Sequence, residues 1–476
     1  MEELSRIRKN SFFYFISIVS RLISNSILFI IVANYYGAGI YGSFTAAHTL
    51  SMLLLILADF GFDLLIISEI SKNRGNAIQV FNRYFPFKIF LSLISFIILN
   101  SLVFILPISS ITRQLVFLFS FNMVFTAIMN MFFAFFRGIE RFDVEAVISS
   151  AANVLIFICT ILMSVYKLNI LFIALSISLI RILSAAAALK KLNLMYGRLS
   201  FVDFYKDLSK TGKQILIFGL HLFFGTLYFQ IDTVLLMSMK GDVDTGIYQA
   251  SFKLLTMSLI VPELIVGSSF PTLSRLFSIN DKSWMDTNRL VLKILLIISI
   301  PLALIILVFP NNIISIIYTK KEYSNAASLL AVSGLILLVR YLAEPFAMCL
   351  TITNKQLIRT RVVIIATFIN LILNLIFIPM WSYNAAIWVS FATNTFVLIA
   401  YVFSLGDLSK ELIKKNKALH ALLFLIMGYL GLIVVRNHNF FLVVAVFLFI
   451  YSLCAYFFLL EDKERKMVIK LLVIQR

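Results

Sequence analysis

Charged residues are scarce in this chain. They make up 13% of its 476 residues, whereas about a quarter of a soluble protein is charged. Hydrophobic residues reach 61%, and the mean hydropathy is +0.98. Because so much apolar surface needs a lipid solvent, we predict an integral membrane protein.

Cysteine is also rare. The three cysteines lie far apart in the sequence, each inside an apolar run: Cys159, Cys349 and Cys454. Their placement excludes a disulfide framework and a cysteine metal cluster. The chain also lacks a glycine-rich phosphate loop, and its polar loops reach about 25 residues at most, too few for a soluble catalytic domain. We therefore expect no enzyme activity, no metal and no cofactor, apart from a proton or sodium ion that could drive transport.

Long apolar runs fill most of the sequence. A helix needs about 20 such residues to cross a hydrocarbon core of about 30 Å. The runs are continuously apolar, whereas the strands of a membrane barrel alternate between apolar and polar residues. We predict an all-α integral membrane fold with about fourteen transmembrane helices, at residues 10–33, 43–68, 83–106, 114–136, 146–165, 169–189, 214–238, 247–271, 289–309, 326–350, 358–379, 382–405, 418–435 and 438–460.

Lysine and arginine are distributed unevenly over the loops. If the N-terminus is cytoplasmic, 29 of the 41 basic residues lie in the tails and loops of that side, and 6 lie in the outer loops. This is the positive-inside pattern of a bacterial inner-membrane protein with both termini in the cytoplasm. The net charge of +18 then suits anionic lipid headgroups, and we do not expect nucleic acid as a partner.

A weak repeat indicates how the helices are grouped. The tripeptide Gly-Ile-Tyr at 39–41 returns at 246–248. Parallel repeats of this kind predict two helical lobes around a central cavity, as in alternating-access transporters. The predicted division is a six-helix lobe at 1–189, a cytoplasmic linker at 190–213, a second six-helix lobe at 214–405, and two C-terminal helices with a tail at 406–476.

Several motifs resemble those of a known family. The chain has ADFGF at 58–62, RGIERF at 137–142 and YFQIDTVL at 228–235, and Asn370 and Asn374 precede Pro379. In this order and at these places relative to the helices, the motifs resemble the polysaccharide transporter family, which includes the O-antigen flippases. That family belongs to the multidrug/oligosaccharidyl-lipid/polysaccharide exporter superfamily. The resemblance covers nearly the whole chain, although the segment 381–386 lacks the family's glycines.

The resemblance implies a flippase that works by alternating access. It would move undecaprenyl-diphosphate-linked oligosaccharide repeat units to the outer leaflet, for O-antigen or another surface polysaccharide. The implied partners are this lipid-linked substrate, membrane lipids, a polysaccharide polymerase and chain-length proteins. A multidrug or cation antiporter and a lipid II flippase of the same superfamily are alternatives. A membrane polysaccharide polymerase is a weaker one, because the outer loops are short.

Of the six basic residues that remain inside the predicted helices, four lie too deep to reach the interface easily. A charge at such a depth usually faces a wet cavity or a partner. Arginine donates paired hydrogen bonds to phosphate oxygens, and lysine supplies a point charge. We predict a cationic cavity for the substrate diphosphate, formed by Arg21, Arg181, Lys253 and Arg340. The alternative is internal pairing, of Lys253 with Asp232 or Glu263 and of Arg340 with Glu344.

Acidic residues inside the helices are candidates for ion coupling, since desolvation favours the neutral acid and lets a carboxylate exchange a proton. Asp232 and Glu263 are these candidates. Pro262, beside Glu263, interrupts the backbone hydrogen bonds of its helix and is a candidate pivot for gating.

Other charges lie near the predicted inner boundary. Lys88 and Lys293 are within a turn or two of it, and we expect their side chains to extend to the interface. Asp59 and Asp63 lie at the inner end of the second predicted helix. We expect them to cap this helix or to pair with basic residues of the following loop.

Overall fold

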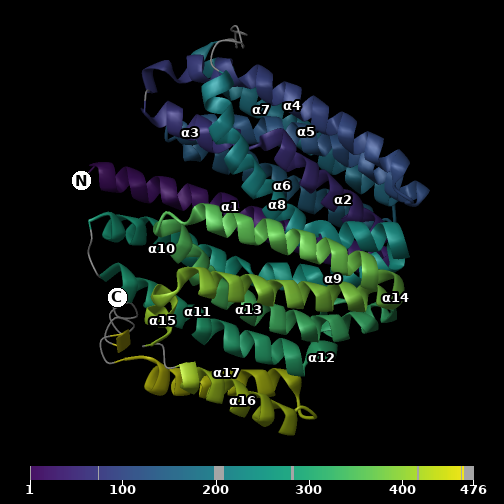
Figure 1. Cartoon of the computed structure of the whole chain (residues 1–476). Helices are drawn as coiled ribbons and strands as arrows, with labels where there is room; N and C mark the ends of the chain where they lie inside the picture. The colour runs from purple at the N-terminus through teal and green to yellow at the C-terminus, as the bar shows by residue number, and fades with distance from the viewer. Residues whose placement is uncertain are drawn as a thin grey trace. The chain divides into compact units, whose positions relative to one another are not determined.

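The computed structural model describes residues 2–72, 74–197, 208–279, 283–414, 418–461, 464 and 465. Helices make up nearly all of this part of the chain, and it contains no strand (Figure 1). The predicted all-α fold is therefore confirmed. The middle of the linker predicted at 190–213 and most of the predicted C-terminal tail lie outside the described residues.

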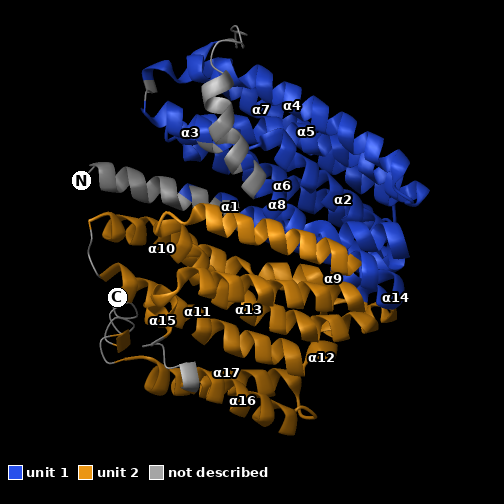
Figure 2. Cartoon of the chain, in the orientation of Figure 1, with its two compact units in different colours: residues 1–249, 375–383 blue, residues 250–374, 384–476 orange. Residues whose placement is uncertain are grey.

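The helices form two compact units, one of residues 1–249 with 375–383 and one of residues 250–374 with 384–476 (Figure 2). We call them unit 1 and unit 2. This division follows compactness, and the lobe boundaries drawn from the repeat stay a prediction. Unit 1 contains α1 (Glu2–Tyr36), α2 (Ala38–Asp59), α3 (Phe62–Lys72), α4 (Ala77–Ile105), α5 (Ser110–Gly138), α6 (Phe142–Val165), α7 (Ile170–Tyr196), α8 (Leu208–Lys240) and the start of α9 (Asp242–Ser258).

Unit 2 holds the rest of α9 and most of the helices that follow it. Within it α11 packs along α13 and α16, whereas in unit 1 α1 packs along α6 and α5 along α7. The helices of unit 2 are α10 (Ile260–Ser278), α11 (Ser283–Val308), α12 (Pro310–Ile317), α13 (Ala326–Ile352), α14 (Gln356–Leu405, apart from 375–383), α15 (Asp407–Lys414), α16 (Ala418–Val434) and α17 (Phe440–Cys454).

The number of crossings agrees with the prediction. Eleven helical segments of the described residues are long and apolar enough to cross a membrane. One of them, α14, has 50 residues and would be about 75 Å long if straight, too long for one crossing. Its backbone is not helical at Ser382, with φ 49° and ψ −132°, so it consists of two helices that are each long enough for one crossing. Counting α14 twice and adding α1 and the shorter apolar α16 gives fourteen.

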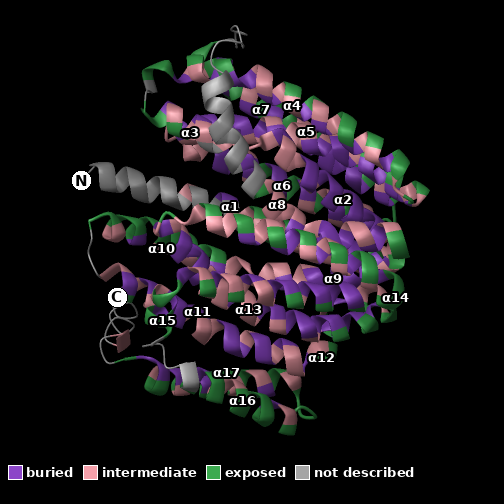
Figure 3. Cartoon of the chain, viewed as in Figure 1, coloured by how far each residue is buried: buried purple, intermediate pink, exposed green. Residues whose placement is uncertain are grey.

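Apolar side chains are exposed and polar side chains are buried, as expected for a protein surrounded by lipid. Large apolar side chains are exposed along the outsides of the helices, such as Phe104 at 82% and Phe403 at 80% (Figure 3). Several polar side chains are instead fully buried, and their hydroxyls donate to backbone carbonyls of the preceding turn. Ser92 donates to the carbonyl of Lys88 at 2.7 Å, and Thr160 to that of Ile156 at 2.7 Å. The exposed apolar faces are suited to contact with acyl chains.

α2 and α9 approach each other backbone to backbone at the two copies of the repeated tripeptide. A Cβ added to Gly246 would overlap the carbonyl oxygen of Ala38, and one added to Gly42 would overlap that of Asp242. Small residues allow membrane helices to pack this closely. The glycine of the second repeat copy is therefore required by the packing within unit 1.

We expect Gly246→Ala to destabilise the protein by roughly 1–3 kcal/mol, because one of the two helices must move away. Thermal unfolding of the purified protein in detergent would measure this as a lower midpoint. Gly225→Ala in α8 is the matched control, since its Cβ would meet no atom within 4 Å. Equal midpoints for the two variants would contradict the proposed packing constraint.

Candidate functional site

Unit 1 brings together two of the four basic residues predicted to bind the diphosphate. Arg181 of α7 is half-buried, and its Nη2 donates to Oδ1 of Asn153 in α6 at 3.4 Å. Arg21 is exposed on α1, which packs along α6, and its positive charge lies close enough to repel that of Arg181. Two neighbouring cations repel each other unless an anion offsets them. The pair is thus arranged to attract an anionic ligand.

The other two predicted residues lie in unit 2. Lys253 is on α9 and Arg340 on α13, and both are half-buried. A third cation, Arg359, lies in the first turn of α14, where its Nη1 donates to Oγ1 of Thr351 at 3.2 Å. Both Arg340 and Arg359 act electrostatically on Tyr401 of α14. The sequence analysis counted Arg359 with the charges of the cytoplasmic loop, although it lies at the start of the helix predicted at 358–379. One cavity formed by all four predicted residues stays a prediction.

The structure places the two coupling candidates in different surroundings. Asp232 of α8 is 1% exposed, and its Oδ2 accepts a hydrogen bond from the Tyr248 hydroxyl at 2.9 Å. Glu263 of α10 is exposed. A buried carboxylate depends on its donors for stability, so Tyr248 is a functional candidate that the sequence analysis missed. The coupling roles of Asp232 and Glu263 stay predictions.

Pro262 is buried in the first turn of α10. The helical path is interrupted just before it, since α9 ends at Ser258 and α10 begins at Ile260. A proline in a helix removes one backbone donor and clashes with the preceding turn, which accounts for an interruption here. The gating role of this break stays a prediction.

The expectation for the charges at the inner boundary is wrong. Lys88 does not extend to the interface but is 0% exposed, and it pairs with Asp59 and Asp63. The reason is a turn in the chain between α2 and α3, which directs both carboxylates towards α4. Lys293 is also buried, at 4% exposed, and its Nζ donates to both carboxylate oxygens of Glu464 at 2.8 Å.

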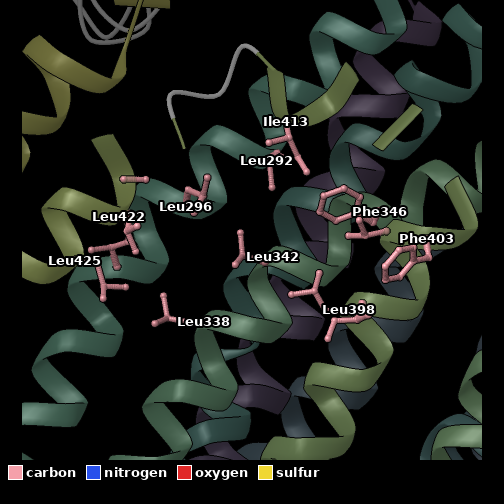
Figure 4. Close-up of a pocket in the computed structure, with 14 residues that line it drawn as sticks. Leu292, Leu296, Leu338, Leu342, Phe346, Leu398, Phe403, Ile413, Leu422 and Leu425 are labelled. Atoms are coloured by element: carbon pink, nitrogen blue, oxygen red, sulfur yellow. The ribbon is translucent and has the colours of Figure 1, made fainter. Parts of the chain in front are cut away.

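Unit 2 contains an apolar groove of about 470 Å³ between α11, α13, α14, α15 and α16. Figure 4 shows side chains of these helices converging on it. The lining is aliphatic and aromatic throughout and includes Leu296, Leu338, Leu342, Phe346, Leu398 and Leu422. A groove without polar groups suits a hydrocarbon chain and offers nothing to a charged ligand.

We expect Tyr248→Phe to destabilise the protein by about 1–3 kcal/mol, because the buried carboxylate of Asp232 loses a donor. A thermal unfolding curve in detergent would show a lower midpoint. Tyr429→Phe removes the same hydroxyl from an exposed position on α16 and should leave the midpoint unchanged. If both variants unfold like the unmodified protein, the hydrogen bond contributes little.

Comparisons with known proteins agree on one kind of membrane protein. The model of a family described as polysaccharide biosynthesis protein matches residues 7–277, and the MatE model matches residues 218–380. No curated protein sequence gives a significant match. These two family matches confirm the resemblance predicted from the motifs.

Solved structures with a similar fold include three transporters. The lipid II flippase MurJ, in an inward closed conformation, is 16% identical over 94% of this chain and 98% of that one, with a TM-score of 0.69. An inward-facing MATE family multidrug transporter is 12% identical over 84% and 96%, with a TM-score of 0.67. A MOP superfamily transporter from Pyrococcus furiosus is 12% identical over 85% and 96%, with a TM-score of 0.61. The chain therefore has the fold of the MOP superfamily.

Proposed function

Because this chain belongs to the polysaccharide biosynthesis protein family and crosses the membrane many times, we propose that it is a flippase for undecaprenyl-diphosphate-linked oligosaccharide repeat units. In this proposal it works by alternating access in the bacterial inner membrane, with both termini in the cytoplasm. It delivers the units to the outer leaflet, where a polymerase and chain-length proteins assemble O-antigen or another surface polysaccharide. It performs no covalent chemistry itself.

The pair of Arg21 and Arg181 is the observation that carries this proposal. The diphosphate is the part of the cargo that hydrocarbon rejects most strongly, and guanidinium groups are suited to phosphate oxygens. Lys253 and Arg340 are proposed as further diphosphate ligands on the basis of their charge and partial burial in unit 2. A site for cationic drugs would need the opposite charge.

The apolar groove of unit 2 supports a lipid-linked cargo. An undecaprenyl chain has to stay in an apolar environment while its headgroup crosses, and the groove supplies one. A lipid II flippase is the second candidate, since its cargo has the same isoprenoid and diphosphate parts and the fold is similar to that of MurJ.

Arg21→Gln and Arg181→Gln should each reduce flipping about tenfold or more, because a hydrogen bond to a charged group is worth about 1.5–3 kcal/mol. The measurement is restoration of surface polysaccharide in a cell lacking its own flippase, with lipid-linked repeat units quantified on each leaflet. Arg436→Gln, at an exposed position, is the control for loss of one positive charge.

Neutral variants that insert and transport normally would refute the diphosphate site. If repeat units already reach the outer leaflet without this protein and polymer still fails to form, it acts as a polymerase or its partner. Rescue of cells depleted of their lipid II flippase, without rescue of surface polysaccharide, would favour the second candidate.

Leu422→Trp should slow transport several-fold, because the indole enters the apolar groove and competes with the hydrocarbon chain. Leu430→Trp is matched to it, since both leucines lie on α16 and are similarly exposed, at 54% and 57%, and Leu430 does not line the groove. The same cell assay, corrected for protein abundance, would compare them. Equal losses would argue against a role for the groove.

A further inference from the structure

Unit 1 contains a group of charged side chains that the proposed function does not use. The ammonium of Lys88 in α4 donates hydrogen bonds to Asp59, at the end of α2, and to Oδ1 of Asp63, in α3, at 3.2 Å. Nδ2 of Asn130 in α5 donates to the second oxygen of Asp59 at 3.3 Å. Four helices therefore meet at one ammonium and two carboxylates. We call Lys88, Asp59 and Asp63 the lysine cluster.

A break in the chain directs both carboxylates towards Lys88. α2 ends at Asp59, and the next two residues, Phe60 and Gly61, have φ values of 38° and 82°. α3 then begins at Phe62, which puts Asp63 in its first turn. A left-handed conformation is unfavourable for phenylalanine, so the surrounding structure holds it in place. Phe62 supplies part of this support, because it is buried in an apolar cluster with side chains of α4 and α5.

The lysine cluster has more negative than positive charge. One ammonium balances one carboxylate, so the fully ionised cluster carries one excess negative charge. An unbalanced charge inside a membrane protein is unfavourable, and two neighbouring carboxylates oppose each other's ionisation. One proton added to the carboxylate pair would make the cluster neutral.

Charges elsewhere on the same helices do not restore the balance. Glu69 accepts a hydrogen bond from Tyr84 at 3.3 Å, and Arg137 pairs with Glu145. The remaining charged residues of the described parts of α2 to α5 are exposed: Lys72, Arg83 and Arg113. Among the described residues, the charged groups that act on Asp59 are Lys88 and Asp63. α8 also packs against α2, and of its described charged side chains Asp232 is bonded to Tyr248 and Lys240 to the carbonyl of Pro379.

The carboxylates are partly exposed at the surface of the protein, whereas the ammonium is enclosed. The side chains of Asp59 and Asp63 are 22% and 25% exposed, whereas that of Lys88 is 0% exposed. Lys88 thus stays bound as a fixed cation, and the carboxylates are the groups that can exchange a proton. Because they share one ammonium, the pair titrates as a unit.

We propose that the lysine cluster is a binding site for one exchangeable proton. The proton comes from water, adds to a carboxylate oxygen and returns to water, so no electron transfer and no further reactant are needed. Asp59 accepts hydrogen bonds from both Lys88 and Asn130, whereas Asp63 among the described residues accepts from Lys88. The proton is assigned to the two carboxylates together, because they share the Lys88 ammonium. This site is separate from Asp232 and Glu263.

Infrared difference spectroscopy on the purified protein in liposomes would test the proposal. Between pH ~5 and ~8 the unmodified protein should lose a carboxylic acid band, and isotope labelling of the aspartate carboxyl carbons should shift that band. Asp63→Asn leaves one ammonium with one carboxylate and should abolish the band. Asp143→Asn, which removes a carboxylate paired with Arg141 near the start of α6, is the control and should retain it.

The band should also be lost in Asp59→Asn, which keeps the test open if Asp63→Asn does not fold. An aspartate band that remains unchanged in both folded variants would overturn the proposal, and so would a protein without any band that the aspartate label shifts. No cargo is present in this measurement, so its outcome is independent of the flippase experiment.

Discussion

The hydrocarbon core of a membrane contains no water, so each backbone polar group and each charge within it has to be satisfied by the chain or by a ligand. Helices meet the first requirement along most of this chain, and hydroxyls such as that of Ser92 bond back to the preceding turn. The charges are harder to satisfy. The places where they gather in unit 1, at the arginine pair and at the lysine cluster, are therefore the places where function is to be sought.

This constraint explains why the fold could be predicted well from the sequence. A membrane crossing needs a continuous apolar run, and such runs are visible without any knowledge of packing. The predicted fourteen crossings agree with the structure even at α14, where the sequence analysis separated two runs at the position of the break at Ser382. The Gly-Ile-Tyr repeat also had structural meaning, because its second glycine lies where the backbones of α2 and α9 are in direct contact.

The charged sites could be predicted only in part, because a charge's partner is set by the three-dimensional path of the chain. Arg21 and Arg181 were identified by their depth in predicted helices, and the structure brings their charges together. Lys88 was misjudged because depth alone cannot distinguish a side chain that extends to the interface from one enclosed by its own helices. The deciding feature was the left-handed Phe60, and no sequence pattern indicates a strained phenylalanine.

The two charged sites of unit 1 are connected through the helices that carry them. α5 supplies Asn130 to the lysine cluster and packs along α7, which carries Arg181. Under the two proposals, a bound proton makes unit 1 more positive and so favours an anionic cargo, and the cargo favours the proton to the same extent. Direct electrostatics would therefore make proton and cargo bind together.

A transporter that exchanges the proton for the cargo would need a conformational change that reverses this preference. Such a change requires an element with two conformational states between the two sites. The break at Phe60 and Gly61 lies within the lysine cluster itself, where a change in its backbone conformation would move Asp63 relative to Lys88.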